Sequence, residues 1–191
     1  MAKQIIIETS ARHIHISDQH LNELFGQGYI LTNIKNLSQP GQFACEEKVT
    51  VIGPKNKMNV TILGPVRKNT QVELSMTDAR ILGISAPVRE SGDIANSASV
   101  TISGPKGSVV ISEGVIIAKR HIHLTPKEAI EFSVSDKQIV FVRVNTGERT
   151  IVFGDVVVRV SSEFSAVMHI DTDEANAGGI KGIVYGEIVE I

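Results

Sequence analysis

The sequence predicts a mainly β protein, built as barrels or a sandwich and organised in two related lobes. Short runs rich in Val, Ile and Thr recur along the chain, and glycine-containing turns separate many of them. Helix signals are few and short. The six-residue segment at positions 12–17 returns at 120–125. Two copies are too few for a solenoid, but they fit two lobes that share a site.

The predicted strands are runs of four to six residues in which β-branched side chains cluster. Turns of sequence Gly-Pro-Lys begin at Gly53 and Gly104, and we interpret them as a fainter repeat. No low-complexity segment or flexible linker divides the chain. The strands are expected at 4–8, 48–52, 59–63, 99–103, 108–111, 114–118, 139–144, 156–160 and 183–188.

Short helices are expected where a Ser, Thr or Asp can cap the first turn. The helix at Ser17–Phe25 has Leu21, Leu24 and Phe25 on one face, and Gly26 ends it. A Thr-Pro-Lys-Glu sequence at 125–128 is a capping box with Pro at the first helical position. Further helices begin at Ser75 and Asp171 and end at Gly83 and at Gly178 or Gly179.

Composition limits the partners and the compartment. The chain has 191 residues, a net charge of −2 and no Trp, which disfavours nucleic acid as a partner. Cys45 is the only cysteine, so no intramolecular disulfide can form and a reducing compartment is favoured. No signal peptide or membrane-spanning run is evident. We therefore expect a soluble cytoplasmic protein with no membrane partner.

The repeated segment reads RHIHIS at 12–17 and RHIHLT at 120–125, so each copy contains His-x-His. Side chains two apart on a strand share a face, which lets two imidazoles converge on one metal ion. Imidazole nitrogen is a good zinc ligand. One His-x-His is a weak signal, and structural histidines are the alternative. Two copies within a repeated motif favour metal binding by His13, His15, His121 and His123.

A second spacing pattern extends this set. His15, His123, His169 and Glu73 each lie two residues before a predicted helix cap. If these positions converge, metal ligands and helix N-termini share a pocket that favours an anion such as phosphate. Taken singly, Glu73 is interpreted as a solvated strand residue and His169 as a packed or surface histidine.

Two Pro-Val-Arg segments, at 65–67 and 87–89, present arginines that match phosphate geometry. Either arginine alone is more simply interpreted as a surface residue after a turn. The sequence has no Gly-x-Gly-x-x-Gly, Walker or Gly-x-Ser-x-Gly motif, so Rossmann, P-loop and α/β-hydrolase enzymes are unsupported.

Together these segments resemble the PduL-type phosphotransacylases, also called phosphate propanoyltransferases. The similarity covers nearly the whole chain in family order and lies in SARHIHIS, LSQPGQFACEE, LGPVRKNTQVELSMTDAR, APVRESGD, GVIIAKRHIHL and MHIDTDEANAGG. It implies two β-barrel domains capped by short helices, with the active site between them. The domains implied are 11–118, and 1–10 plus 119–191, so the N-terminal strand joins the barrel made by the C-terminal third.

The resemblance also implies the site. Two zinc ions per chain are expected, one at His13, His15 and Glu73 and the other at His121, His123 and His169. Arg67 is implied as the catalytic, phosphate-contacting residue, and Gln42 and Ser91 as further substrate-binding residues.

The implied reaction converts propanoyl-CoA or acetyl-CoA and phosphate reversibly into acyl phosphate and coenzyme A (CoA). The family also implies a homodimer and association with bacterial microcompartments. Targeted members carry an N-terminal extension, whereas this chain reaches His13 almost at once. The sequence leaves the CoA contacts and the preferred acyl length open.

Two other functions fit the same residues. A binuclear zinc hydrolase of phosphoesters or thioesters would use a metal-bound hydroxide. A non-catalytic barrel with structural zinc is the other alternative, although structural zinc usually has four protein ligands. We expect no covalent acyl-enzyme, because nothing near Cys45 in the sequence suggests an activating partner.

Overall fold

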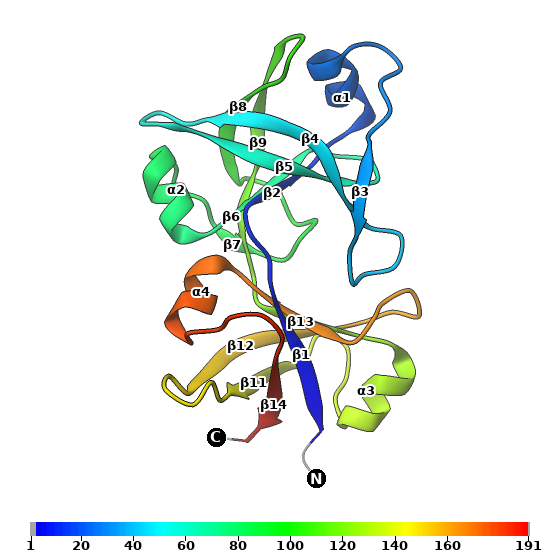
Figure 1. The fold of residues 1–191 in the computed structure, drawn as a ribbon, viewed down its shortest axis with the longest axis vertical. Coiled ribbons are helices and arrows are strands. Elements are labelled where there is room, and N and C mark those ends of the chain that lie inside the picture. The colour runs from blue at the N-terminus through cyan, green and yellow to red at the C-terminus, as the bar shows by residue number, and fades with distance from the viewer. Residues whose placement is uncertain (1–2, 191) are drawn as a thin grey trace. The chain divides into compact units, whose positions relative to one another are not determined.

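The computed structural model describes residues 3–190, and the chain divides into two compact units (Figure 1). The central unit comprises Ala11–Leu37 and Gly41–Ala118. The terminal unit comprises the chain up to Ser10, Ser38–Pro40 and the chain from Lys119 onward. Strands dominate the described residues, which confirms the mainly β fold. Of the helices described, none is long and apolar enough to cross a bilayer.

The terminal unit is a closed barrel of six strands within the described residues. Its buried face holds large aliphatic side chains such as Ile5, Ile7 and Ile122, packed around Phe153. Full burial of each such side chain contributes about 1.5–3 kcal/mol. In order around the barrel the strands are β1 (Gln4–Thr9), β13 (Val167–Ile170), β10 (His121–Leu124), β12 (Ile151–Val160), β11 (Ile139–Val144) and β14 (Val184–Val189).

The central unit closes a second barrel of six strands, again counted over the described part of the chain. Its core includes Ile14, Ile62, Val72 and Ile102. In order the strands are β4 (Phe43–Ile52), β5 (Lys57–Gly64), β2 (His13–His15), β6 (Gln71–Leu74), β9 (Ser108–Ala118) and β8 (Ala98–Ser103), with β3 (Asn33–Asn36) beside β4 and β7 (Val88–Arg89) beside β9.

The two barrels share one pairing scheme. In the central barrel β2 is parallel to β5 and antiparallel to β6, and in the terminal barrel β10 is parallel to β12 and antiparallel to β13. Likewise β6 is parallel to β9, as β13 is to β1. Strand β1 thus holds in the terminal barrel the place that β9 holds in the central one. Each then runs on into the other unit, which is the strand exchange that the resemblance implies.

The four helices described begin at the predicted caps. The side chains of Ser17, Ser75, Thr125 and Asp171 each accept a hydrogen bond from the backbone N–H three residues later. The capping box predicted at Thr125 is confirmed, and Asp171 forms a second one. The helices are α1 (Asp18–Phe25), α2 (Met76–Leu82), α3 (Pro126–Phe132) and α4 (Thr172–Ala177).

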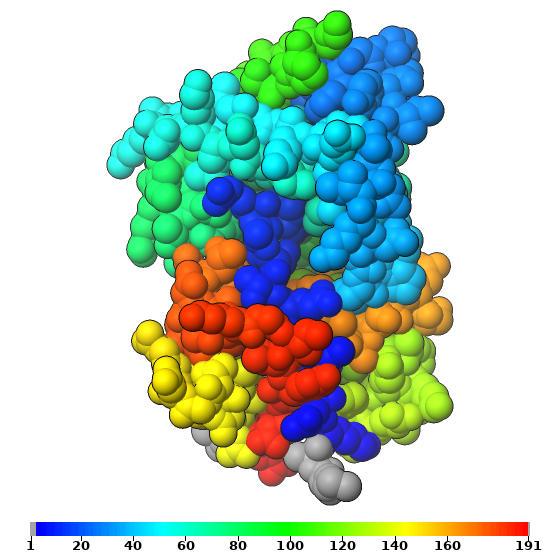
Figure 2. All heavy atoms as spheres, viewed as in Figure 1, coloured from blue at the N-terminus to red at the C-terminus, as the bar shows by residue number. Residues whose placement is uncertain are grey.

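The structure corrects the sequence prediction in two places. Residues 108–111 and 114–118 form the single strand β9, in which Gly114 has φ of +134°. The turns at Gly53 and Gly104 both belong to hairpins of the central barrel, so they do not echo the two-lobe repeat. A Cβ at Gly53 would lie 2.3 Å from the Leu82 carbonyl oxygen, and one at Gly104 2.6 Å from that of Leu24. Figure 2 shows the second turn lying against α1.

Candidate metal centres

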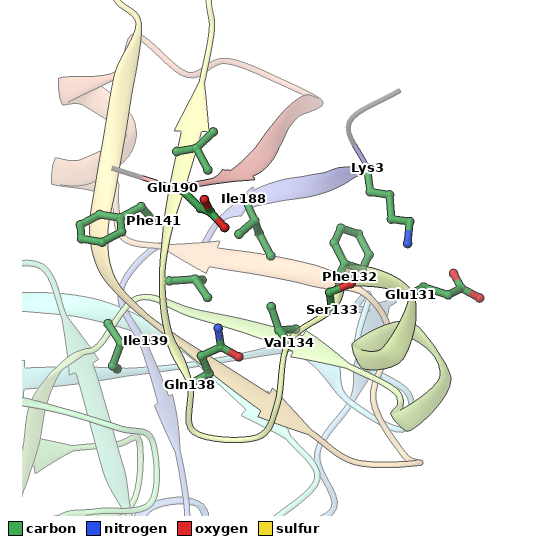
Figure 3. Close-up of a pocket in the computed structure, with 12 residues that line it drawn as sticks. Lys3, Glu131, Phe132, Ser133, Val134, Gln138, Ile139, Phe141, Ile188 and Glu190 are labelled. Carbon is green, nitrogen blue, oxygen red and sulfur yellow. The ribbon is translucent and has the colours of Figure 1, made fainter.

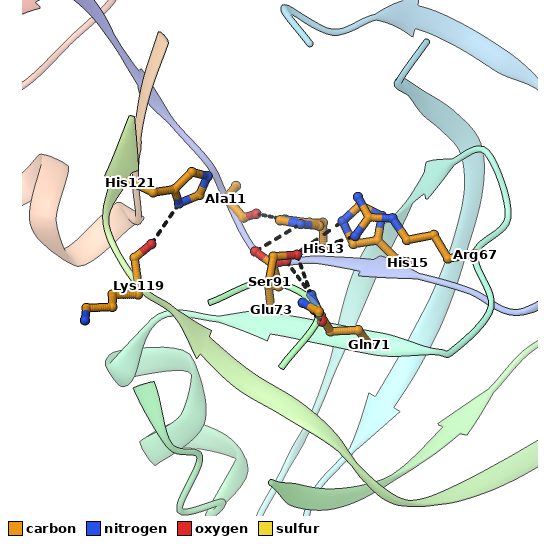
Figure 4. A network of polar contacts seen from close by, with 10 residues as sticks. Ala11, His13, His15, Arg67, Gln71, Glu73, Ser91, Lys119 and His121 are labelled. Carbon is orange, nitrogen blue, oxygen red and sulfur yellow. Dashed lines mark hydrogen bonds and ion pairs between the residues drawn. The ribbon is translucent and has the colours of Figure 1, made fainter. Parts of the chain in front are cut away.

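The central unit brings His13, His15 and Glu73 together. His13 and His15 project from one face of β2, and Glu73 lies directly opposite His13 on β6. All three residues are buried, and their candidate ligand atoms lie within 4.8 Å of one another. In Figure 4 these side chains point toward one another.

Backbone geometry fixes the proton on His13. Its Nδ1 lies 2.9 Å from the carbonyl oxygen of Ala11. Because a carbonyl only accepts, Nδ1 carries a hydrogen, and in the neutral ring the lone pair is therefore on Nε2. That Nε2 is 3.4 Å from Glu73 Oε2, and His15 Nε2 is 3.9 Å from Glu73 Oε1. The nitrogen that faces Glu73 is therefore the one that suits a metal ion.

Burial and neighbouring charge set the protonation of this cluster. Burial favours the neutral form of every member, but His13 and His15 hold the pKa of Glu73 well below its usual range. Glu73 in turn outweighs burial at His13 and raises that pKa. At His15 burial dominates, helped by His13 and Arg67, and lowers the pKa to about 3. His15 is thus neutral at physiological pH, as a metal ligand must be.

A polar network surrounds the Glu73 carboxylate. The Gln71 amide donates to Glu73 Oε1 at 2.6 Å and to Ser91 Oγ at 2.9 Å, and it accepts from the Gly92 N–H. Arg67 reaches Ser91 Oγ at 3.4 Å (Figure 4). Its backbone N–H donates to the carbonyl of Ile16, the residue after β2. The guanidinium is therefore held next to the cluster.

The terminal unit brings His121, His123 and His169 together in the equivalent way. His121 lies opposite His169 across β10 and β13, as His13 lies opposite Glu73. Nδ1 of His121 donates to the Lys119 carbonyl at 2.8 Å, two residues earlier, which repeats the His13 geometry. The candidate ligand atoms again lie within 4.8 Å of one another.

His123 combines a lowered pKa with a buried nitrogen that lacks a hydrogen-bond partner among the residues described. Burial, together with His121 and His169, lowers its pKa to about 2. Its Nδ1 is buried and lacks a hydrogen-bond partner among the residues described. The Phe164 ring packs against the His123 imidazole, and their ring centroids are 4.2 Å apart. A neutral, buried imidazole with an unsatisfied nitrogen is what a metal ion would complete.

Both clusters suit zinc chemically. Each offers three nitrogen or carboxylate donors, and catalytic zinc commonly has three protein ligands and an open fourth position. Zinc–nitrogen bonds are about 2.0–2.1 Å, so ligand atoms this close need only small side-chain rotations to converge. The four positions two residues before a helix cap all belong to these two candidate clusters.

Two of the predicted substrate residues contact the Glu73 network, and the role of the third, Gln42, stays a prediction. Arg67 and Ser91 belong to the Glu73 network, whereas Gln42 is tied by its backbone carbonyl to Leu37, in the turn before β4. Gln71, which was not among the predicted residues, provides an amide to the Glu73 network. Its signal was present in the sequence, because Gln71 and Glu73 are two apart on one strand, like the histidines of each pair.

The terminal unit also has an open pocket of about 680 Å³ away from its histidines (Figure 3). It lies between the end of α3 and strands β11 and β14, and Phe132, Val134, Gln138 and Ile188 are among its lining residues. No predicted site residue lines it.

Fold and site together define a class: a duplicated β-barrel protein in which each barrel gathers three metal-ligand side chains. A family model described as phosphate propanoyltransferase matches residues 6–181. The chain is 52% identical to a phosphate propanoyltransferase of Listeria monocytogenes over 96% of its own length and 86% of the relative. A relative of the same name from Clostridioides difficile is 52% identical over 97% of this chain and 89% of its own length. One from Thermotoga maritima is 53% identical over 91% of this chain and 83% of its own length.

The chain therefore belongs to the phosphate propanoyltransferase family, whose members are acyltransferase enzymes. The family expected from the sequence motifs is confirmed.

Proposed function

We propose that this protein converts propanoyl-CoA or acetyl-CoA and phosphate reversibly into acyl phosphate and CoA at a site with two zinc ions. The observation that carries the proposal is the pair of three-residue clusters at matching register positions, in a chain of this family. His13, His15 and Glu73 would hold one ion, and His121, His123 and His169 the other. That both clusters serve one pocket stays a prediction.

The reaction exchanges one bond to the acyl carbon for another. A phosphate oxygen attacks the thioester carbonyl carbon, the carbon–oxygen bond forms, and the carbon–sulfur bond breaks. The electron pair leaves with sulfur as CoA thiolate, which takes a proton from solvent. Bound zinc supplies Lewis acidity toward an oxygen of the reactants.

Arg67 has two tasks in this proposal. Its guanidinium neutralises phosphate charge and stabilises the negative charge that develops on the carbonyl oxygen. Ser91 and Gln71 hold it in place, since the Ser91 hydroxyl contacts both side chains. Gln42 is proposed as a substrate contact from the family resemblance alone.

The decisive variant is Arg67→Ala. We expect it to keep two zinc ions per chain and to lose about 100- to 1,000-fold in turnover, because one preorganised donor to a developing oxyanion is worth that much. Arg67→Lys keeps the charge but not the planar fork, so it should recover only part of the rate. The measurement is phosphate-dependent thiol release from propanoyl-CoA and acetyl-CoA, with zinc content determined on the same samples.

The same assay separates the alternatives. Thiol release that requires phosphate and yields acyl phosphate supports transfer, whereas release without phosphate indicates hydrolysis. Metal removal that leaves the fold intact and abolishes turnover argues against a structural role for zinc. Unchanged turnover in Arg67→Ala contradicts the assigned role of that residue.

The family resemblance also leads us to propose a homodimer and association with a bacterial microcompartment. Light scattering of the purified protein tests the first. Co-purification with shell proteins from the native host tests the second.

A further inference from the structure

Each His-x-His motif is preceded by an arginine whose ion pair is repeated in the two barrels. Arg12 Nη1 lies 3.0 Å from Asp78 Oδ1, and Arg120 Nε lies 2.9 Å from Glu174 Oε1. The two acids correspond: each is the third residue after a helix cap, in α2 and in α4. These are the helices that follow Glu73 and His169.

The arginine sits within a three-residue unit that serves the first histidine. Ala11 provides the carbonyl that accepts from His13 Nδ1, Arg12 follows, and His13 is the candidate ligand. Lys119, Arg120 and His121 repeat the arrangement. Fixing the arginine side chain therefore fixes both the ligand and the carbonyl that orients its ring.

The ion pair also connects the two strands of each cluster. Arg12 directly precedes β2, and its side chain reaches α2, the helix after β6, which is the strand of Glu73. Arg120 likewise directly precedes β10, and its side chain reaches α4, the helix after β13, which is the strand of His169. Each ion pair therefore links the His-x-His strand to the helix that follows the strand of Glu73 or His169.

The carboxylates of these pairs are more shielded from water than their arginines. The Asp78 side chain is 8% exposed and that of Arg12 45%, while those of Glu174 and Arg120 are 22% and 30% exposed. Glu174 also accepts from the Asp171 N–H, and Arg12 also reaches the Asn59 carbonyl. Removing either arginine would leave a carboxylate that is partly or wholly shielded from water without its cation, which is costly.

We propose that Arg12 and Arg120 are positioning residues, each holding the third-ligand strand and the His-x-His strand of its own cluster in the geometry that binds metal. The inference rests on the proposed zinc sites. Outer residues that orient metal ligands typically contribute 10- to 100-fold to metal affinity. The effect is local, so Arg12 acts on the central cluster and Arg120 on the terminal one.

The test measures zinc affinity of full-length chains by competition with a chromophoric chelator. Variant His121→Ala/His123→Ala leaves only the central cluster, and His13→Ala/His15→Ala leaves only the terminal one. Arg12→Met, which keeps a long apolar stem, should weaken zinc about tenfold in the first background and less than about twofold in the second. Arg120→Met should show the opposite pattern, and Arg12→Lys should recover part of the loss.

Arg143→Met is the matched control, because it breaks the Arg143–Glu187 pair on the terminal barrel away from both clusters. It should leave zinc affinity unchanged. In the otherwise unchanged chain, Arg12→Met should lose one of two zinc ions at a chelator concentration that leaves the parent chain loaded. Where Arg12→Met does not fold, as judged by circular dichroism, Asp78→Asn keeps the shape of the acid and should give the same loss.

The inference is overturned if the arginine variants bind zinc as tightly as the chains from which they are made. It is also overturned if Arg12→Met weakens zinc binding at both clusters alike, or if Arg143→Met weakens zinc binding as much as Arg12→Met does. Absence of zinc from the parent chains is a different outcome, because it defeats the proposed function itself.

Discussion

The two clusters occupy matching places in their barrels yet differ in one ligand. Glu73 lies opposite His13 in the central barrel, and His169 lies opposite His121 in the terminal barrel. With neutral imidazoles, the central cluster carries a charge of −1 and the terminal cluster none. A divalent cation would leave a net charge of +1 in the first and +2 in the second. The central cluster is therefore suited to hold a cation firmly, and the terminal one to attract an anion.

The terminal cluster has a carboxylate too, placed behind the histidine instead of among the ligands. Glu8 is the register neighbour of His169 on β1, and its Oε2 lies 3.9 Å from His169 Nδ1. Ser38 Oγ donates to the same oxygen at 2.6 Å. In the central barrel the corresponding neighbour of Glu73 is the apolar Ile116. At 3.9 Å the Glu8 carboxylate is beyond hydrogen-bond distance of the imidazole, so we expect it to act on His169 through its charge.

The largest effect is expected when one histidine is removed from either cluster. His15→Ala and His123→Ala should each lose one of two zinc ions and about a thousandfold in turnover, since metal stabilisation of several kcal/mol is lost. Zinc content and thiol release are measured on the same preparations. If one variant keeps full turnover with one ion, the two clusters do not both serve the reaction.

Replacing Glu73 by the residue type found at position 169 tests whether charge distinguishes the zinc affinities of the two clusters. Glu73→His gives the central cluster the terminal ligand set, so it should still bind zinc but about tenfold more weakly, because a direct negative charge is lost. Chelator competition in the His121→Ala/His123→Ala background measures this. Unaltered affinity would mean that charge does not distinguish the clusters.

Cys45 lies in the central unit only, and we expect it to have no role in turnover. It is buried in the central barrel, and burial raises its pKa to about 11, so the thiolate becomes abundant only as pH approaches that value. Cys45→Ala should keep turnover within about twofold and cost about 1 kcal/mol of stability for the small cavity. Alkylation of the native protein at neutral pH should be slow. Recovery of an acylated Cys45 would contradict the expectation.

The sequence predicted the helices well because their signals are local. Ser17, Ser75, Thr125 and Asp171 cap helices as expected, since a cap needs only the next three residues. The β character was also visible, through clustered β-branched residues. Strand order was not, because β1 pairs with β13 and β14 at the far end of the chain. Closure into barrels came from the family resemblance.

The strands that carry the clusters were the hardest to predict locally. Strand β6 reads Gln-Val-Glu-Leu and is buried at every position. Its alternating polar residues are typical of a half-buried strand, so the sequence does not indicate that both faces are buried. The histidine clusters followed from the repeated motif, but Gln71 did not. Its amide matters only because register places it opposite His15. Roles in binding metal and substrate stay predictions until the variants above are measured.

The exchange of β1 has a consequence for how the chain is made. This strand is synthesised before the central barrel, whereas its partners β13 and β14 are synthesised only after that barrel. The nascent chain must therefore carry an unpaired, apolar edge while the central barrel assembles. A stop codon placed after Ala118 would leave that strand permanently without neighbours, and we expect such a fragment to aggregate.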